Sequence, residues 1–265
     1  MSDTLVSLNQ VSMAYGRGPT ATKAIEEVTL DIARGEFIAV VGPSGCGKSS
    51  LMKLISGLHP TATGTLTVEG KPVTSPIKAV GMAFQNSNLL PWRSIVDNVL
   101  LPLEIVQPHR SRMRSERAQY RDKAVKLLES VGLKGFTDKF PWELSGGMQQ
   151  RSSICRALIH EPEILMLDEP FGALDAFTRE ELWCTLRDVQ AARKVTVMLV
   201  THDLREAVFL ANTVYVMSNR PGRIMKRCSV NLPRPRDLEV TYTQEFQNIV
   251  HELRAAIGGH GSGKH

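Results

Sequence analysis

The sequence has few cysteines, no long apolar run and no recognisable leader, and each of these absences excludes a class of protein. Only 4 of its 265 residues are cysteines, and none lies at CxxC spacing from another. A disulfide framework or a zinc site is therefore not expected, whereas a reducing cytosol fits. No run approaches the roughly 18 apolar residues that cross a bilayer as a helix, and MSDTLVSLNQ does not have the pattern of a secretory signal. We therefore expect a protein that does not span a membrane by itself.

The charge of the chain is only mildly unbalanced. The net charge is +5 and the isoelectric point is near 9.1, and the densest basic cluster covers residues 109–123. A nucleic-acid patch is one interpretation of this cluster. We favour an amphipathic helix whose arginines face water, because apolar residues recur in and after the cluster at helical spacing. These residues are Tyr120, Ala124, Leu127, Leu128 and Val131.

The strand patterns are of two kinds. Segments around Leu30 and Leu66 alternate apolar and polar residues, which indicates strands with one buried face. Other runs are apolar without a break, which is typical of parallel strands covered on both faces. These runs cover residues 37–41, 164–167, 195–200 and 214–217. Helical patterns lie between some of the runs, so the sequence predicts an α/β sheet.

Three helices are predicted from apolar residues at helical spacing. The first has a face made of Leu51, Leu54, Ile55 and Leu58. The second has a face made of Leu182, Leu186 and Val189, and we expect it to begin at a capping box formed by Thr178 and Glu181. The third is an amphipathic stretch from Phe246 to Leu253, and the final GGHGSGKH is expected to be disordered.

We predict four parts along the chain. Residues 1–86 hold a β subdomain and the first part of the core, and residues 161–225 hold the remainder of the core. Residues 87–160 have few β-branched runs and look mostly helical, so they are expected to form an inserted helical subdomain. Residues 226–265 form a C-terminal tail.

The segment GPSGCGKS fits the phosphate-binding pattern G-x-x-x-x-G-K-[ST] and lies between an apolar run and an amphipathic helix. Its glycines allow backbone N–H groups to turn toward phosphates, and the helix N-terminus adds a partial positive charge. Lys48 can reach the β- and γ-phosphates, and the Ser49 hydroxyl can bind Mg²⁺. A glycine-rich turn with an exposed lysine is the alternative, and the context disfavours it. The expected nucleotide-binding residues are Gly42, Pro43, Ser44, Gly45, Cys46, Gly47, Lys48, Ser49 and Ser50.

Two further apolar runs end in residues suited to nucleotide chemistry. Asp168 follows one of them and is expected to hold the metal, while Glu169 beside it can polarise an attacking water. His202 follows another and can donate a hydrogen bond to a γ-phosphate. Taken alone, the acids could be surface residues before a turn. Behind a P-loop, they predict a Mg²⁺–ATP site.

The order of these motifs resembles that of the ATP-binding subunits of ABC transporters. The motifs are the P-loop, Gln85, LSGGMQQR, LMLDEP, ALD and His202. The resemblance implies a P-loop NTPase (RecA-like) core with an N-terminal antiparallel β subdomain and an inserted helical subdomain. It also implies that Tyr15 stacks on adenine, that Gln85 reaches Mg²⁺ and the attacking water, and that Asp175 communicates across a dimer. Met148 stands where glutamine is common in the family, and we expect no loss of activity from it.

The resemblance also explains why the chain carries a second anion-binding helix start at LSGGMQQR. In the family, two ATPase subunits pair head to tail, and the serine and glycines of one chain close over the γ-phosphate held by the other. Ser145, Gly146 and Gly147 are accordingly expected to contact the ATP of a second copy. A helix N-terminus with a hydroxyl and free backbone N–H groups is suited to this role.

Further segments are most similar to the nitrate/taurine/sulfonate/bicarbonate branch of importers: AFQNSNLLPW, PFGALDAFTR and SNRPGRI. This similarity implies an ATPase that energises import of a small solute such as a sulfonate, taurine or nitrate. Its implied partners are membrane permease subunits and, indirectly, a solute-binding protein, at the cytoplasmic face of the membrane. Trp92 and its neighbours could line a permease groove, or Trp92 could pack in the core. The alternative is a soluble ABC-type ATPase acting on nucleic acid, which we do not expect.

Overall fold

The computed structural model describes residues 3–16 and 18–258 and divides the chain into two compact units. The P-loop unit comprises the chain up to Ile77 and from Thr196 onward, and the helical unit comprises residues 78–195. Seven of the last eight residues, for which disorder is predicted, lie outside the described part. Among the described residues, no helix combines the length and the apolar character needed to cross a bilayer.

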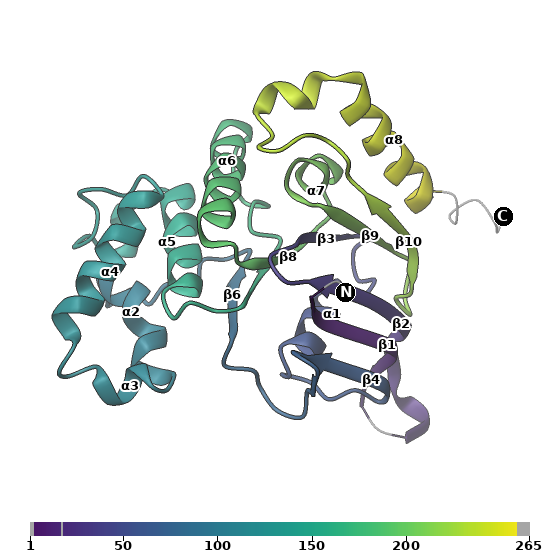
Figure 1. The fold of residues 1–265 in the computed structure, drawn as a ribbon, viewed down its shortest axis with the longest axis horizontal. Coiled ribbons are helices and arrows are strands. Elements are labelled where there is room, and N and C mark those ends of the chain that lie inside the picture. Colours follow the sequence, from purple (N-terminus) through teal and green to yellow (C-terminus); the bar gives the residue numbers. More distant parts are fainter. Residues whose placement is uncertain (1–2, 17, 259–265) are drawn as a thin grey trace. The chain divides into compact units, whose positions relative to one another are not determined.

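The N-terminal part of the P-loop unit is an antiparallel sheet with the strand order β2, β1, β4, β5 (Figure 1). The strands are β1 (Thr4–Tyr15), β2 (Thr22–Ala33), β4 (Thr63–Val68) and β5 (Lys71–Pro72). A short 3₁₀ turn, η1 (Gly18–Thr20), precedes β2. Leu30 and Leu66 are buried, as the alternating patterns predict. The predicted N-terminal β subdomain is therefore confirmed.

A second sheet of the P-loop unit is mainly parallel, with β3 lying between β8 and β9, and with β10 antiparallel to β9. Its strands are β3 (Phe37–Val41), β8 (Thr196–Thr201), β9 (Thr213–Met217) and β10 (Ile224–Ser229). Every residue of β3, β8 and β9 is buried, so the unbroken apolar runs are correctly predicted as strands covered on both faces.

The described residues of the P-loop unit also form three helices: α1 (Lys48–Ile55), α7 (Leu204–Leu210) and α8 (Gln244–Gly258). The 3₁₀ turn η3 (Leu238–Tyr242) precedes α8, which packs against α7, β9 and β10. Phe246 and Leu253 of α8 are buried, as their spacing predicts. The prediction for Leu58 is wrong, because α1 ends before Gly57 turns to a φ of 73°, and Leu58 is 58% exposed.

The helical unit contains two parallel strands, β6 (Val80–Phe84) and β7 (Ile164–Asp168), and a group of helices in which α2, α4 and α5 pack together (Figure 1). The helices and the 3₁₀ turn η2 are α2 (Ile95–Ile105), α3 (His109–Arg112), α4 (Arg117–Ser130), η2 (Pro141–Glu143), α5 (Gly146–Leu158) and α6 (Ala176–Arg193). The helices α2 to α5 lie within residues 87–160, for which a helical subdomain is predicted, whereas β6, β7 and α6 of the same unit lie outside that range. The bounds of the subdomain therefore stay a prediction.

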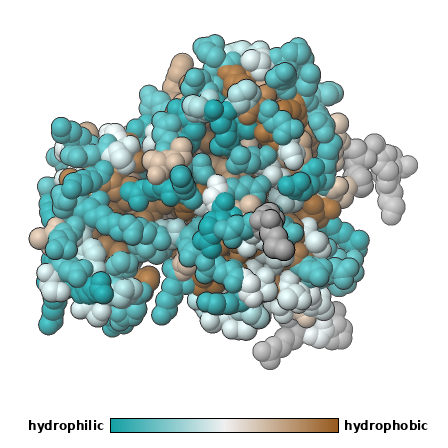
Figure 2. Space-filling model, viewed as in Figure 1, coloured by the Kyte–Doolittle hydropathy of each residue, from teal (hydrophilic) through white to brown (hydrophobic). Residues whose placement is uncertain are grey.

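The basic cluster is divided between α3 and α4, and its apolar residues in α4 are buried. Several of its cations pair with acids: Arg117 with Asp97, Arg121 with Asp138 and Lys123 with Glu161. Hydrophilic side chains cover most of the molecular face seen in Figure 2. The interpretation as the solvent-exposed face of an amphipathic helix is confirmed for residues 117–123, whereas residues 109–112 form the separate short helix α3.

The predicted capping box at Thr178 and Glu181 is wrong. Helix α6 begins earlier, and the Asp175 carboxylate accepts a hydrogen bond from the Thr178 backbone N–H at 3.0 Å. This bond is the main cause that lowers the pKa of the Asp175 carboxyl. Glu181 instead pairs with Arg151 at 2.8 Å. Aspartate is as good an N-cap as threonine, and here it comes first along the chain.

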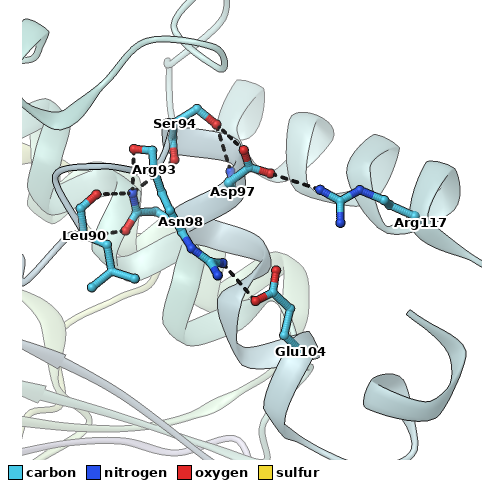
Figure 3. A network of polar contacts seen from close by, with 7 residues as sticks. All are labelled: Leu90, Arg93, Ser94, Asp97, Asn98, Glu104 and Arg117. Atoms are coloured by element: carbon cyan, nitrogen blue, oxygen red, sulfur yellow. Dashed lines mark hydrogen bonds and ion pairs between the residues drawn. The ribbon is translucent and has the colours of Figure 1, made fainter. Parts of the chain in front are cut away.

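Asn98 organises the segment between β6 and α2 (Figure 3). Its side chain is fully buried, accepts a hydrogen bond from the Leu90 N–H at 2.7 Å and donates to the carbonyls of Leu90, Arg93 and Ser94. The buried Asn98 side chain thereby holds the backbone of the segment in place. Trp92 is 71% exposed on it, so the alternative of core packing is wrong.

We expect Asn98→Ala to destabilise the helical unit by about 2 to 4 kcal/mol, because it removes a fully buried side chain and leaves several part-buried backbone groups without its hydrogen bonds. Urea unfolding followed by circular dichroism measures this loss. Glu104→Gln is the matched control, because it breaks a half-exposed ion pair with Arg93 in the same network and should cost less than about 1 kcal/mol. Equal losses for the two variants would contradict the assignment.

Candidate functional site

The predicted phosphate cradle lies at the carboxyl end of the buried strand β3, and α1 follows it directly. Gly47, the N-cap of α1, has a φ of 110°, which residues with a side chain rarely adopt. A Cβ on Gly47 would also lie 2.7 Å from the Ala24 carbonyl oxygen, and one on Gly42 would lie 2.8 Å from that of Met217. The loop conformation therefore requires glycine at both positions.

Lys48 is only 6% exposed. Its Nζ donates to the carbonyl oxygens of Gly42 at 2.8 Å and Pro43 at 2.9 Å, and lies 4.0 Å from the Cys46 sulfur. Burial is the main cause that raises the pKa of the Cys46 thiol, which agrees with a small filler side chain rather than a nucleophile. Ser44, Gly45 and Ser49 remain exposed. The ammonium is thus held inside a loop whose rim is open to solvent.

Tyr15, at the end of β1, lies beside the start of α1. Its hydroxyl is 3.2 Å from the Ser50 hydroxyl, and the Lys53 ammonium donates to it at 3.4 Å. The ring packs edge-on against His59, with the centroids 5.2 Å apart. The structure therefore brings Tyr15 to the P-loop helix, and stacking on adenine stays a prediction.

His202 emerges at the same sheet edge as the P-loop. Val41, the last residue of β3, pairs in register with Thr201, the last residue of β8, so the P-loop and His202 both follow that pair. His202 is exposed. Two predicted parts of the nucleotide site, the P-loop and His202, therefore lie where adjacent parallel strands end.

In the helical unit, Gln85, Asp168 and Glu169 likewise lie where two adjacent parallel strands, β6 and β7, end. Phe84 pairs with Asp168 across β6 and β7, so Gln85 and Glu169 leave adjacent strands at one edge. A Cβ on Gly172 would lie 3.1 Å from the Gln85 amide nitrogen, which places that side chain over the loop after Glu169. Glu169 has a φ of 47°. Such strained backbone costs about 1–3 kcal/mol and is concentrated at functional sites.

The second cradle begins α5. Ser145 is its N-cap and accepts a hydrogen bond from the Met148 N–H at 3.4 Å, while Ser145 and Gly146 remain exposed. Gly147 is buried, and a Cβ there would lie 2.4 Å from the Thr178 methyl carbon, next to the α6 cap at Asp175. The start of α5 can therefore receive an anion from outside the unit, and Asp175 lies close to it.

The sequence interpretation missed the residues that tie α5 to the segment after β6. Gln150 donates to the Phe84 carbonyl at 2.9 Å, and Gln149 accepts from the Ser87 hydroxyl at 3.2 Å. Arg156 donates to the carbonyls of Ser87 and Asn88 at 2.6 and 2.8 Å. The two glutamines lie within LSGGMQQR, but bonds to a distant backbone leave no sequence pattern.

A buried parallel strand, a glycine-dependent phosphate loop and a helix that starts at the loop's lysine define a P-loop nucleoside triphosphatase. A family model described as "ABC transporter" matches residues 25–172. The chain belongs to the ABC transporter family, and its predicted likeness to the ATP-binding subunits is confirmed.

Curated relatives resemble nearly the whole chain. The "aliphatic sulfonates import ATP-binding protein" of Bacillus licheniformis is 43% identical over 231 residues, covering 87% of each chain. The protein of the same name from Bacillus subtilis is 43% identical over 244 residues, covering 92% of this chain and 91% of the relative.

Solved structures have the same fold. A dimeric ATP-binding cassette in a post-hydrolysis state, bound to ADP and Pi, is 28% identical, with a TM-score of 0.70 over 86% of this chain and 100% of its own. A component of an ABC transporter complex from Clostridium perfringens has a TM-score of 0.75 at 23% identity over 95% of this chain and 99% of its own, and supports the fold alone. The predicted P-loop NTPase core is confirmed.

We expect Gly47→Ala to abolish nucleotide binding, because its Cβ would meet a backbone oxygen at a φ of 110°. Gly45→Ala is the matched control. Its φ is also positive, at 74°, but no atom lies within 4 Å of the added carbon, so the cost should be about 1–2 kcal/mol. Titration with a fluorescent ATP analogue measures both variants. Strong binding by the Gly47 variant would contradict the geometry.

Proposed function

We propose that the chain is the ATP-hydrolysing subunit of an importer for a small anion such as an aliphatic sulfonate, with taurine or nitrate as related solutes. The observation that carries this proposal is the 43% identity, over 87% of each chain, to a protein named for aliphatic sulfonate import. The chain works beside permease subunits at the cytoplasmic face of the membrane and, through them, with a solute-binding protein.

ATP hydrolysis is assigned to the predicted residues. The P-loop amides and Lys48 bind the phosphates, Tyr15 stacks on adenine, Glu169 accepts a proton from the attacking water, and His202 contacts the γ-phosphate. The glutamate is well placed for its role because Gln85 and Asp168 emerge at the same strand edge.

Ser49, Gln85 and Asp168 would hold Mg²⁺. All three offer oxygen ligands, which this ion prefers, and the pairing of Phe84 with Asp168 brings two of these donors to one edge. When bound, the ion supplies charge stabilisation for the leaving phosphate. Gln85 and Asp168 therefore fit the metal, and Ser49 is its proposed third ligand.

A second copy of the chain completes the site. Ser145, Gly146 and Gly147 lie over the γ-phosphate of the ATP held by the partner, and Asp175 communicates between the copies. Support comes from the open N-terminus of α5, where a hydroxyl and helix N–H groups favour an anion, and from the dimeric relative. Loss of the γ-phosphate weakens this contact, so hydrolysis opens the dimer.

The permease docks on the segment between β6 and α2. Trp92 is exposed there, and Asn98 holds the backbone around Leu90 in place. An exposed aromatic side chain on an ordered segment is suited to contact with another protein. The subunit itself does not touch the solute.

We expect cells that lack this chain to lose uptake of a radiolabelled alkanesulfonate, and the wild-type chain to restore it. Lys48→Ala should not restore it, because the phosphates then lose their buried cation. Uptake of an unrelated sugar is the control. Sulfonate uptake that is unaffected by removal of the chain would contradict the assigned solute class, although not ATP hydrolysis.

We expect Ser145→Arg to keep ATP binding by the monomer but to block the ATP-driven dimer, because a long cation then occupies the second cradle. The Glu169→Gln background prevents hydrolysis and traps the dimer, which size-exclusion chromatography with light scattering detects. Ser111→Arg, on the exposed helix α3, is the matched control and should dimerise normally. Normal dimerisation of the Ser145 variant would exclude the trans arrangement.

A further inference from the structure

Helix α7 begins two residues after His202, and hydrogen bonds hold its start. The Asp203 carboxylate accepts from the backbone N–H groups of Arg205 at 2.8 Å and Glu206 at 3.4 Å. The Asp203 N–H donates to the Thr201 hydroxyl oxygen at 3.0 Å, and that hydroxyl donates to the buried Glu206 carboxylate. His202 is therefore exposed between neighbours that are fixed on both sides.

Two arginines of the C-terminal segment hold the other end of α7. The last carbonyls of a helix have no partner within it. Arg234 donates to the Leu210 carbonyl at 2.5 Å. Arg236 donates through Nη1 to the carbonyls of Val208, Phe209 and Ala211 at 2.9, 3.0 and 2.7 Å. Four consecutive carbonyls thus accept from two side chains.

Arg236 is 2% exposed, and its Nη2 also donates to the Val230 carbonyl at 3.0 Å. Burial is the main cause that lowers its pKa to about 10, so the guanidinium is still charged at neutral pH. A cation at a helix C-terminus is stabilised by the helix dipole. Burying a charge is costly, and the hydrogen bonds of Arg236 to four carbonyls offset part of that cost. The guanidinium N–H groups of Arg236 therefore serve to fix the C-terminal end of α7.

We propose that Arg236, assisted by Arg234, is a positioning residue for His202. By fixing the C-terminal end of α7, Arg236 sets the orientation of the helix. It thereby sets the position of His202, which lies just before the N-terminal end of the same helix. The helix has seven residues, about 10 Å or two turns, so a displacement of one end is transmitted to the other. This inference rests on the proposed contact of His202 with the γ-phosphate.

A double-mutant cycle on the full-length protein tests the proposal through steady-state ATP hydrolysis. We expect Arg236→Met to lower kcat about tenfold while KM for ATP changes less than about twofold. In a His202→Ala background, the same substitution should lower kcat by less than about twofold, because the residue through which it acts is already absent. Arg236→Lys should recover part of kcat, since it keeps the charge but not the forked geometry.

Lys226→Met is the matched control. Lys226 ties α8 to β10 through Glu252 at 2.6 Å, so its loss loosens the same C-terminal segment without freeing the α7 carbonyls, and kcat should stay within about twofold of wild type. If Arg236→Met does not fold, Arg234→Ala takes its place in the cycle. Arg234 is exposed and donates to one α7 carbonyl, so a smaller loss of about threefold is expected.

The outcomes distinguish a failure of the positioning inference from a failure of the proposed function. Equal losses in the wild-type and His202→Ala backgrounds would overturn the positioning role and leave the proposed function intact. An unchanged kcat in Arg236→Met would do the same. An unchanged kcat in His202→Ala alone would instead refute the proposed contact of the histidine, and the positioning inference with it.

Discussion

The architecture depends on one steric constraint, which is the close approach of the Gly47 backbone to the Ala24 carbonyl at a positive φ. This approach lets α1 begin immediately after a tight loop. Lys48, the first residue of the helix, then folds back onto the carbonyls of that loop. Tyr15 meets the same helix two residues later, at Ser50. The absence of a side chain at Gly47 therefore determines where the Lys48 ammonium, the Tyr15 ring and the N-terminus of α1 meet.

The helical unit is organised by strand register. Pairing of Phe84 with Asp168 fixes which residues leave β6 and β7 together, and the Phe84 carbonyl also accepts from Gln150 of α5. One end of one strand thus positions Gln85, the adjacent acids and the helix that carries Ser145. Residues from three distant sequence motifs are thereby brought close together.

Periodicity predicted the strands well because burial on one or two faces leaves a direct pattern in the sequence. It failed at helix ends. Thr178 and Glu181 matched a capping box, but Asp175 offered an equally good cap earlier in the chain. The roles of Asn98, Arg156 and Arg236 could not be predicted, because their partners are backbone carbonyls. Any residue supplies such a carbonyl, so only the folded chain identifies them.

The ties between Arg156 and the carbonyls of Ser87 and Asn88 have a mechanical consequence. Together with the Gln149–Ser87 bond, they fasten one surface segment along the length of a single helix. That segment cannot slide without rupturing charged hydrogen bonds or carrying α5 with it. A displacement of the segment that carries Trp92 would therefore also strain the bonds that hold α5, the helix that begins at Ser145.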